Sequence, residues 1–396
     1  MKKSPDPFFT PRLAIVGASC RAMAHSATAA GFDCVAADLF ADADLTHVAP
    51  TTRLQRYPAD AWRWLQGQSV DGWMYGGGLE NHPRLLRRLA TLAPLWGCGE
   101  QTIRQVRDPW WLAEQCTKHG LTMPEMTRFR PASERDRWLY KPRRTAGGLG
   151  IALAEHVPPG AESSTAYWQK LTAGEPVSFT FFSTEQGTLL LGTARQWIGP
   201  DFGAPGAFQF AGAIAPWEVL PSVLNRVRVL AESLTQTAAL RGLWGLDAIV
   251  AGEQVYPLEI NPRPTATVEL WERIWQHNWT AAHVQTFRTG SGPPEVSLPV
   301  NPTLWAKQIL YVRQPGRMTD DAWQQLTTRF KTALDRDAKS TEIEIADIPP
   351  PGTPLEPGWP LLTVFACGVD IDTVRQRLTG MQCEVYRVIE GAAIRG

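Results

Sequence analysis

The sequence has few lysines, no paired cysteines and no long apolar run, and each scarcity excludes a class of protein. Eight of the 39 basic residues are lysines and the formal net charge is zero, so no basic patch indicates a nucleic-acid or polyanionic partner. The six cysteines are dispersed without a Cys-x-x-Cys pair, which argues against a structural zinc site and a disulfide framework. No uncharged apolar stretch is long enough to span a bilayer and no apolar segment follows the N-terminal lysines, so we expect a cytoplasmic protein without membrane contact.

The composition fits a soluble globular protein of more than one domain. The chain has 396 residues, with 44% hydrophobic and 20% charged side chains, and this length favours two or three domains. We expect one boundary near residues 100–108. A second boundary is expected at the Gly/Pro-rich segment 290–294.

The N-terminal segment has the pattern of a parallel sheet. Residues 12–17 read as a buried strand, residues 19–30 as a helix ended by Gly31, and residues 33–38 as a second apolar strand. This β-α-β order lacks a full Gly-x-Gly-x-x-Gly, so it does not support a dinucleotide site. Another strand-like run ends in Gly76–Gly78, where the glycines allow either a ligand close to the backbone or simply a tight turn.

The next motif is a strand, residues 138–142, that contains Lys141 and continues into a loop with Gly147, Gly148 and Gly150. Such a glycine loop can close over a triphosphate, and the ammonium group can neutralise its charge. The lysine precedes the glycines, so the motif is not a Walker A loop. The alternative interpretation is an ordinary hairpin loop with a solvated lysine.

Two apolar runs, residues 245–250 and 256–260, are separated by Ala251-Gly252-Glu253-Gln254 and predict a β-hairpin. Glu259 and Asn261 are two apart, so on a strand they leave the same face, and Asp247 lies on the partner strand. Two carboxylates and an amide oxygen can converge on a hard cation such as Mg²⁺. The alternative is a solvated hairpin with ordinary surface acids.

Further elements are expected along the chain. Residues 97–106 read as a connector, and the helix from Trp110 to His119 should begin at the N-cap Asp108 with Pro109 in its first turn. Residues 204–214 read as a loop. Helices are expected over residues 221–241, 269–286, 319–336 and 370–378, and C-terminal strands over residues 304–312, 342–346, 361–366 and 383–388.

These motifs, in this order, resemble the ATP-grasp superfamily, most closely its branch of predicted ATP-dependent carboligases related to biotin carboxylase. The resemblance covers nearly the whole chain and implies a mixed α/β and α+β architecture in three parts. Residues 1–104 would form a pre-ATP-grasp parallel-sheet domain, residues 105–290 two lobes that hold Mg-ATP, and residues 291–396 a small α+β unit packed on the large lobe. It rests on the segments Arg107–Pro109, Lys141–Gly150, Gln169–Ser178, Asp247–Arg263 and Asp347–Thr363.

Carried over by position, the resemblance implies a site for ATP and Mg²⁺. Lys141 would contact the phosphates and the loop 147–150 would cover them, while Arg263 would face the transferred phosphoryl group. Mg²⁺ would be held by Asp247, Glu259 and Asn261. The adenine and ribose contacts would come from the hinge residues Gln169, Lys170, Leu171 and Glu175, with Ser178 beside them. Lys170 stands where many ATP-grasp enzymes have a glutamate, so it is alternatively a second nucleotide lysine.

The implied activity is that of an ATP-dependent carboxylate–amine ligase. A substrate carboxylate would take the γ-phosphoryl group to form an acylphosphate, and an amine would then displace phosphate. A substrate carboxylate could lie at the Gly76–Gly78 loop, Arg195 or Arg263. The substrates are expected to be small molecules, such as an amino acid joined to a small molecule or to a one-carbon cofactor precursor, and a homodimer is left open. Two alternatives are a carboxylase-type enzyme that phosphorylates bicarbonate and a nucleotide-binding regulatory module without turnover.

Overall fold

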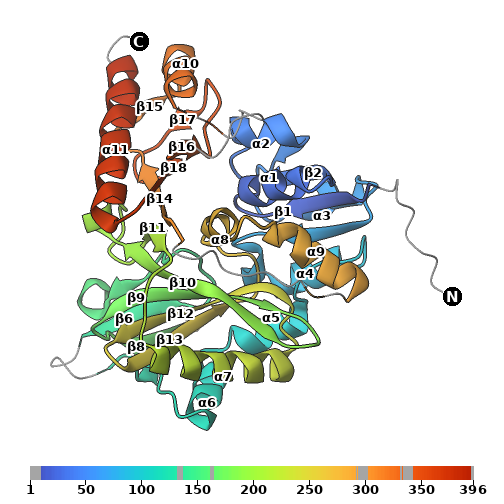
Figure 1. Ribbon diagram of the computed structural model, residues 1–396, viewed down its shortest axis with the longest axis vertical. Helices are drawn as coiled ribbons and strands as arrows, with labels where there is room; N and C mark the ends of the chain where they lie inside the picture. The colour runs from blue at the N-terminus through green and yellow to red at the C-terminus, as the bar shows by residue number, and fades with distance from the viewer. Residues whose placement is uncertain are drawn as a thin grey trace.

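The computed structural model describes residues 10–131, 137–160, 165–290, 292, 302–330, 332 and 342–393. Within these residues the strands form a parallel four-stranded sheet, a small four-stranded sheet, an eight-stranded sheet and a two-stranded ribbon. Figure 1 shows the N-terminal sheet on one side of the molecule and the C-terminal helix on the other, with the large sheet between and below them. None of the described helices is long and apolar enough to cross a membrane.

The N-terminal sheet has the order β3-β2-β1-β4, and all its pairs are parallel. The β-α-β opening predicted from the sequence is confirmed. One face packs against α1, α2 and α9, and the other against α3 and α4. The elements are β1 (Arg12–Val16), α1 (Arg21–Ala29), β2 (Asp33–Asp38), α2 (Ala43–Val48), β3 (Thr51–Arg53), α3 (Ala61–Gln66), β4 (Gly72–Tyr75), the 3-10 helix η1 (Leu79–Asn81) and α4 (Pro83–Leu89).

Two helices join this sheet to the rest of the chain. The expected connector 97–106 is partly wrong, because residues 100–106 form α5 (Glu100–Val106). Its Ile103 and Val106 lie one turn apart and are buried, and this packing supports a helix that the short sequence pattern did not indicate. The following helix α6 (Pro109–Lys118) begins as predicted, since the Asp108 carboxylate accepts a hydrogen bond of 2.9 Å from the Trp110 amide.

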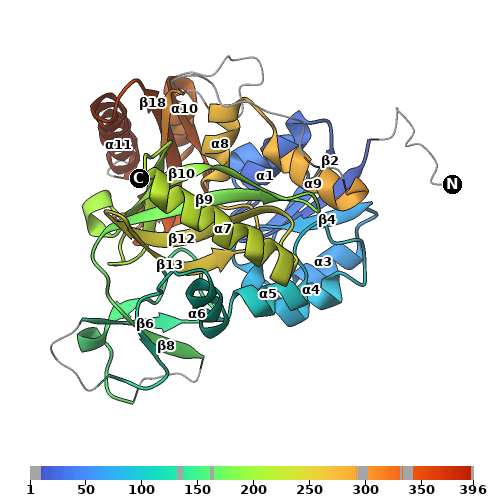
Figure 2. The same cartoon turned by 60° about the horizontal axis from the view of Figure 1, so that its bottom comes forward.

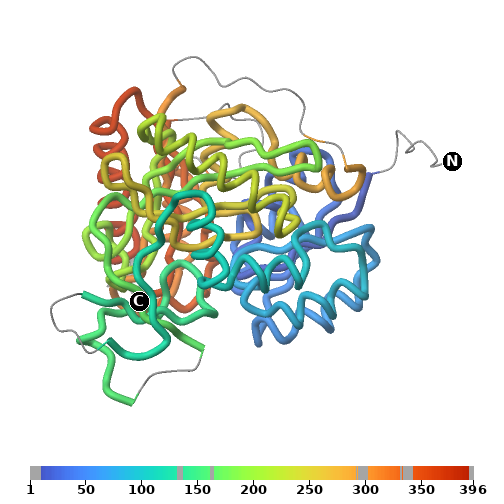
Figure 3. Tube along the Cα trace, turned by 90° about the horizontal axis from the view of Figure 1, so that it is seen from below, coloured from blue at the N-terminus to red at the C-terminus, as the bar shows by residue number. Residues whose placement is uncertain are grey.

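A small lobe projects from the body of the molecule (Figures 2 and 3). Its sheet has the order β5-β8-β6-β7, with antiparallel pairs. Trp138, Trp168 and Val157 form the small core of this lobe. The elements are β5 (Met126–Thr127), β6 (Trp138–Pro142), β7 (Ala152–Leu153), the 3-10 helix η2 (Ala154–His156) and β8 (Ala166–Lys170).

The large sheet has the order β13-β12-β9-β10-β11-β14-β18-β16 and is antiparallel throughout. The helix predicted over 221–241 forms α7 and buries one face of the sheet, while α8 covers the other. Three strands of the C-terminal unit, β14, β18 and β16, continue this sheet beyond β11. The elements before that unit are β9 (Glu175–Ser183), β10 (Thr188–Ile198), the 3-10 helix η3 (Pro200–Phe202), β11 (Phe210–Ala215), α7 (Pro221–Ala238), β12 (Gly242–Ala251) and β13 (Gln254–Asn261).

Two sequence expectations in the large lobe need correction. The expected loop 204–214 ends in the strand β11, because its small residues let β14 approach; a Cβ on Gly212 would lie 2.2 Å from the Lys307 carbonyl oxygen. The helix expected over 269–286 is two helices, α8 (Val268–Trp275) and α9 (Trp279–Thr289). Gln276 adopts the left-handed conformation with φ of 50°, and Asn278 caps α9.

The C-terminal unit contains β14 (Leu304–Tyr311), β15 (Gly316–Arg317), α10 (Asp320–Arg329), β16 (Ile343–Ala346), β17 (Pro354–Leu355), β18 (Pro360–Gly368) and α11 (Ile371–Ala393). The strand predicted over 383–388 is wrong, because this segment belongs to α11. Its buried positions 374, 378, 381, 385 and 388 follow helical spacing across the whole helix. Part of the predicted helix 319–336 and most of the segment 290–294 lie outside the described residues.

Candidate Mg-ATP site

The predicted hairpin is confirmed as β12 and β13, whose register places Asp247 opposite Glu259 and Gly245 opposite Asn261. Leu246 and Ala248 pack in the core beneath α7, so the side chain of Asp247 lies on the other face of the sheet. Glu259 and Asn261 share that face with it. The three predicted metal ligands are therefore brought together.

Asp247 is the most constrained of the three. Its two oxygens accept hydrogen bonds from Gln196 Nε2 at 3.0 Å and from Asn261 Nδ2 at 2.8 Å. Burial raises the pKa of the Asp247 carboxyl to about 6, and the neighbouring Glu259 carboxylate adds to that rise. Ser178, directly across from Asp247 on β9, donates a hydrogen bond that opposes it.

This donor set fits a hard divalent cation. Two carboxylates face each other across a strand pair, and Asn261 supplies an amide oxygen beside them. A cation between the carboxylates would replace their mutual repulsion with attraction. The described residues contain no group of three or more His, Cys, Asp and Glu side chains arranged for a metal.

Arg263 follows this hairpin and lies next to the N-terminal sheet. Its Nε donates to Glu80 Oε1 at 2.8 Å, and its Nη atoms lie 3.1 Å from the Pro264 carbonyl oxygen and 3.5 Å from Asn261 Oδ1. Burial lowers the pKa of the guanidinium, but the Glu80 carboxylate outweighs it, and the pKa is raised. Sequence reasoning did not identify Glu80. Its position two residues after the Gly76–Gly78 loop was the one sequence feature that could have marked it as a site residue.

On the small lobe, Lys141 and Gln169 form a buried pair. Lys141 Nζ donates to Gln169 Oε1 at 2.9 Å, and the ammonium group lies 5.8 Å from the centre of the Tyr167 ring. Gln169 Nε2 is buried and has no hydrogen-bond partner among the described residues. A buried amide donor without a partner is rare in proteins, and this one lies next to Lys141, where a ligand could supply the acceptor.

The glycine loop lies against the large lobe. Gly147, Gly148 and Gly150 all have positive φ, of 61°, 76° and 74°. The Gly147 carbonyl accepts a hydrogen bond of 3.0 Å from the Phe210 amide. A Cβ on Gly148 would lie 1.9 Å from the Phe208 carbonyl oxygen, so a side chain there would force the loop and the large lobe apart.

A cavity lies between the glycine loop and the hairpin, lined by Lys141, Arg143, Gly148 and Glu259 among others. Arg107 also lines it. The Arg107 guanidinium lies 3.3 Å from Glu259 Oε2 and donates to the Thr145 carbonyl and Asn81 Oδ1, both at 3.1 Å. Sequence reasoning used Arg107 only as a helix start, although an arginine before a helix N-terminus was a usable sign of an anion site.

The predicted hinge residues divide into different environments. Gln169 faces Lys141, and Lys170, the next residue on β8, points to the opposite side of that strand. The Leu171 amide donates to the Arg137 carbonyl. Glu175 accepts from Trp217 Nε1 at 3.1 Å and lies 3.5 Å from Arg195, which stacks on the Trp217 ring. Ser178 lies directly across from Asp247, on β9.

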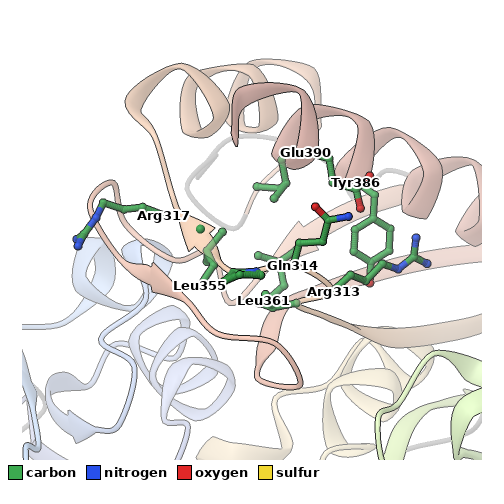
Figure 4. Close-up of a pocket in the computed structure, with 11 residues that line it drawn as sticks. Arg313, Gln314, Arg317, Leu355, Leu361, Tyr386 and Glu390 are labelled. Carbon is green, nitrogen blue, oxygen red and sulfur yellow. The ribbon is translucent and has the colours of Figure 1, made fainter. Parts of the chain in front are cut away.

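A second cavity lies in the C-terminal unit, between β18 and α11 (Figure 4). Arg313 stacks on the ring of Tyr386 at 3.6 Å there, and Tyr386 donates to the Tyr311 carbonyl. These contacts pack α11 onto the sheet, and we assign this cavity no part in the site.

Comparisons with known proteins agree with this geometry. An ATP-grasp domain family matches residues 106–267, while no curated protein is similar in sequence. The fold is similar to N5-carboxyaminoimidazole ribonucleotide synthetase in its ADP complex, with a TM-score of 0.70 and 14% identity over 95% of this chain and 97% of that one. It is similar to the biotin carboxylase domain of Hydrogenobacter thermophilus 2-oxoglutarate carboxylase with MgADP and bicarbonate, with a TM-score of 0.69 and 12% identity over 92% and 88%.

The synthetase from Thermotoga maritima has a TM-score of 0.66 and 13% identity over 94% of this chain and 98% of that one. Residues 106–267 thus match the ATP-grasp domain family, and the fold of the whole chain is similar to that of these synthetases and of biotin carboxylase.

Proposed function

We propose that this chain is an ATP-dependent ligase that activates a small carboxylate by phosphorylation and passes the acyl group to an amine. The observation that carries the proposal is the convergence of two groups of residues on one cavity. Glu259 lines the cavity from the hairpin, with Asp247 and Asn261 next to it on the same face of the strand pair, and Lys141, Arg107 and Gly148 line the rest.

In the proposed site Lys141 binds the phosphates of ATP, and the backbone of the loop 147–150 covers them. Gln169 Nε2 donates to the nucleotide from the hinge, which satisfies the amide that has no partner among the described residues. Leu171 contributes backbone contacts. We assign Lys170 no phosphate contact, because strand alternation turns its side chain away from Lys141.

Mg²⁺ held by Asp247, Glu259 and Asn261 would offset the negative charge of the transferring phosphoryl group. Arg263 presents its remaining N–H groups to the oxygens of that phosphoryl group, and Arg107 stands on the other side of Glu259. These fixed positive charges act on charge that develops during transfer, so the site needs no protein nucleophile. In the second step an amine attacks the acyl carbon, its nitrogen loses a proton, and phosphate leaves.

A second candidate acceptor is bicarbonate. It is favoured by a similar fold solved with MgADP and bicarbonate, which is a property of that protein. The two acceptors are distinguished by products: hydroxylamine traps an acyl intermediate from a carboxylic acid, whereas a carboxylase releases ADP in proportion to bicarbonate. A regulatory module without turnover would bind ATP and release no ADP with any acceptor.

The test is a screen of ADP release from Mg-ATP with pairs of carboxylic acids and amines, with bicarbonate included, followed by the mass of the product. Glu259→Ala and Asn261→Ala should abolish ADP release while the circular dichroism spectrum stays unchanged. Near-normal turnover in either variant would contradict the assignment of Glu259 and Asn261 as Mg²⁺ ligands. Glu253→Gln, at the exposed tip of the same hairpin, is the matched control and should keep full activity.

A further inference from the structure

Two consecutive residues of the N-terminal unit each hold an arginine of the ATP-grasp domain. They are Glu80 and Asn81, in η1, directly after the Gly76–Gly78 loop at the carboxyl end of β4. Glu80 accepts from Arg263, and Asn81 accepts from Arg107. We call Glu80 and Asn81 the arginine clamp.

The Glu80–Arg263 contact is buried on both sides. The side chains are 0% and 12% exposed, and the Nε–Oε1 distance is 2.8 Å. The second carboxylate oxygen, Oε2, is buried without a hydrogen-bond partner among the described residues. Burying a carboxylate oxygen without a hydrogen bond destabilises the fold. We therefore infer that the contact of Glu80 with Arg263 has a role beyond packing the two units together.

The Asn81–Arg107 contact reaches the other side of the same site. Besides Asn81 Oδ1, Arg107 contacts the Thr145 carbonyl in the glycine loop and the Glu259 carboxylate, a proposed metal ligand. Asn81 therefore fixes a guanidinium that touches both halves of the cavity.

The glycines before η1 are packed against protein. A Cβ on Gly76 would lie 2.6 Å from the Met23 methyl group, one on Gly77 3.4 Å from Arg263 Cζ, and one on Gly78 2.9 Å from Tyr57 Oη. Gly78 has a φ of 94°, which the turn into η1 requires. The loop brings the backbone close enough for η1 to reach the two arginines, and this favours the tight turn over a ligand-binding loop.

We propose that the arginine clamp positions Arg263 and Arg107 for phosphoryl transfer, so that the N-terminal unit completes the catalytic site without touching the nucleotide. This inference rests on the proposed function. Glu80 and Asn81 are positioning residues: they act through the two guanidinium groups. Their loss should weaken binding of the transition state and spare binding of the ground state, because only the transferring phosphoryl group needs both arginines in place.

The probes are MgADP alone and MgADP with aluminium fluoride, which mimics the transferring phosphoryl group and requires no knowledge of the acceptor. Glu80→Leu and Asn81→Ala should bind MgADP within about threefold of wild type and lose about tenfold or more in affinity for the aluminium fluoride complex. Glu80→Gln, which keeps an acceptor for Arg263 Nε, should fall between. In a double variant with Arg263→Lys, Glu80→Leu should add no further loss, since both changes remove one interaction.

A second readout is independent of nucleotide. The Nε–Hε signal of Arg263 in ¹⁵N-arginine-labelled protein, assigned by its absence from Arg263→Lys, should move and exchange faster with solvent in Glu80→Leu. The matched control is Glu272→Gln, a half-buried glutamate that accepts from Ser26 at the same junction of units and contacts no arginine of the site. It should change neither the arginine signal nor either affinity.

Each other outcome overturns the proposal. An unchanged Arg263 signal in Glu80→Leu would show that the contact does not hold the guanidinium. An undiminished aluminium fluoride complex, or an equal loss of both affinities, would show that the clamp only stabilises the fold. Wild-type protein that fails to bind MgADP would refute the proposed function itself, and that failure is distinguishable because it precedes any substitution.

Discussion

Asp247 and Glu259 lie directly opposite each other on β12 and β13, two carboxylates on one face of a strand pair. Burial raises the pKa of the Asp247 carboxyl to about 6, and repulsion from the Glu259 carboxylate adds to the rise, so ionisation of both groups is unfavourable without a cation. On the proposed function, the two carboxylates lower the stability of the metal-free protein and would be neutralised by Mg²⁺.

Asp247→Asn should stabilise the metal-free protein and abolish turnover. The substitution removes the repulsion, and the Gln196 amide can turn over to keep a hydrogen bond, so the free energy of unfolding should rise by about 1 kcal/mol. Calorimetry without Mg²⁺ and ADP release with Mg²⁺ measure the two effects. A lower melting temperature in Asp247→Asn would contradict the repulsion argument.

Alanine substitutions at Gly148 and Gly147 test whether the glycine loop must pack against the large lobe. Gly148→Ala would place a methyl group 1.9 Å from the Phe208 carbonyl oxygen, whereas the Cβ of Gly147→Ala meets nothing within 4 Å. Alanine is strained by the positive φ at both positions, so the difference in Mg-ATP affinity between the two variants reports the contact with Phe208 alone. We expect about tenfold weaker Mg-ATP binding by calorimetry in Gly148→Ala than in Gly147→Ala. Equal affinities would show that the loop need not close on residues 208–210.

Lys141 and Lys170 are the two lysines predicted to bind the nucleotide, and the structure places them in different environments. Lys141 faces the cavity beside Gln169, and Lys170 points to the other side of β8. Lys141→Ala should weaken Mg-ATP binding by about 2 kcal/mol, the size of a charge-assisted contact, while Lys170→Ala stays within about 0.5 kcal/mol of wild type. Filter binding with labelled ATP is sufficient. A loss on Lys170→Ala as large as that on Lys141→Ala would restore the alternative that Lys170 is the second nucleotide lysine.

The buried His283 should make the folded protein less stable in acid. Its Nδ1 accepts from the Leu243 amide at 2.9 Å, its Nε2 lies 3.1 Å from the Trp96 carbonyl oxygen, and burial lowers its pKa to about 4. The unfolded chain binds a proton at His283 near pH 6.5, whereas the folded protein does so only near pH 4. The free energy of unfolding is therefore at its full value above pH 6.5 and falls by about 3 kcal/mol as the pH drops towards 4.

The comparison is urea unfolding at pH 7.5 and pH 4.5 for wild type and His283→Gln. Glutamine can accept from Leu243 and donate to Trp96 without titrating, so this variant should lose less stability in acid. His25, whose pKa is also lowered to about 4, titrates in both proteins and cancels in the comparison. Parallel losses in the two proteins would exclude His283 as the source.

The sequence predicted those parts of the site that local patterns encode. The Ala-Gly-Glu-Gln turn and the two-residue spacing of Glu259 and Asn261 are properties of a short segment, and the hairpin followed. Local patterns marked the positions of Glu80 and Arg107 but could not identify the residues that these two contact. Their partners are 183 and 152 residues away, and no periodicity reports a contact made only by the packing of separate units. The strand expected over 383–388 failed because six residues are too short to separate a strand from a buried helix face.

The shared sheet has a consequence for how the chain can be divided. β11 is hydrogen-bonded to β10 on one side and to β14 on the other, so the C-terminal unit is joined to the large lobe through a continuous ladder. A chain shortened to residue 290 would leave the backbone groups of β11 unpaired along an open edge, the kind of template on which protein chains aggregate or exchange strands. The strands β14, β18 and β16 thus protect the edge of β11, and we expect a chain shortened to residue 290 to aggregate.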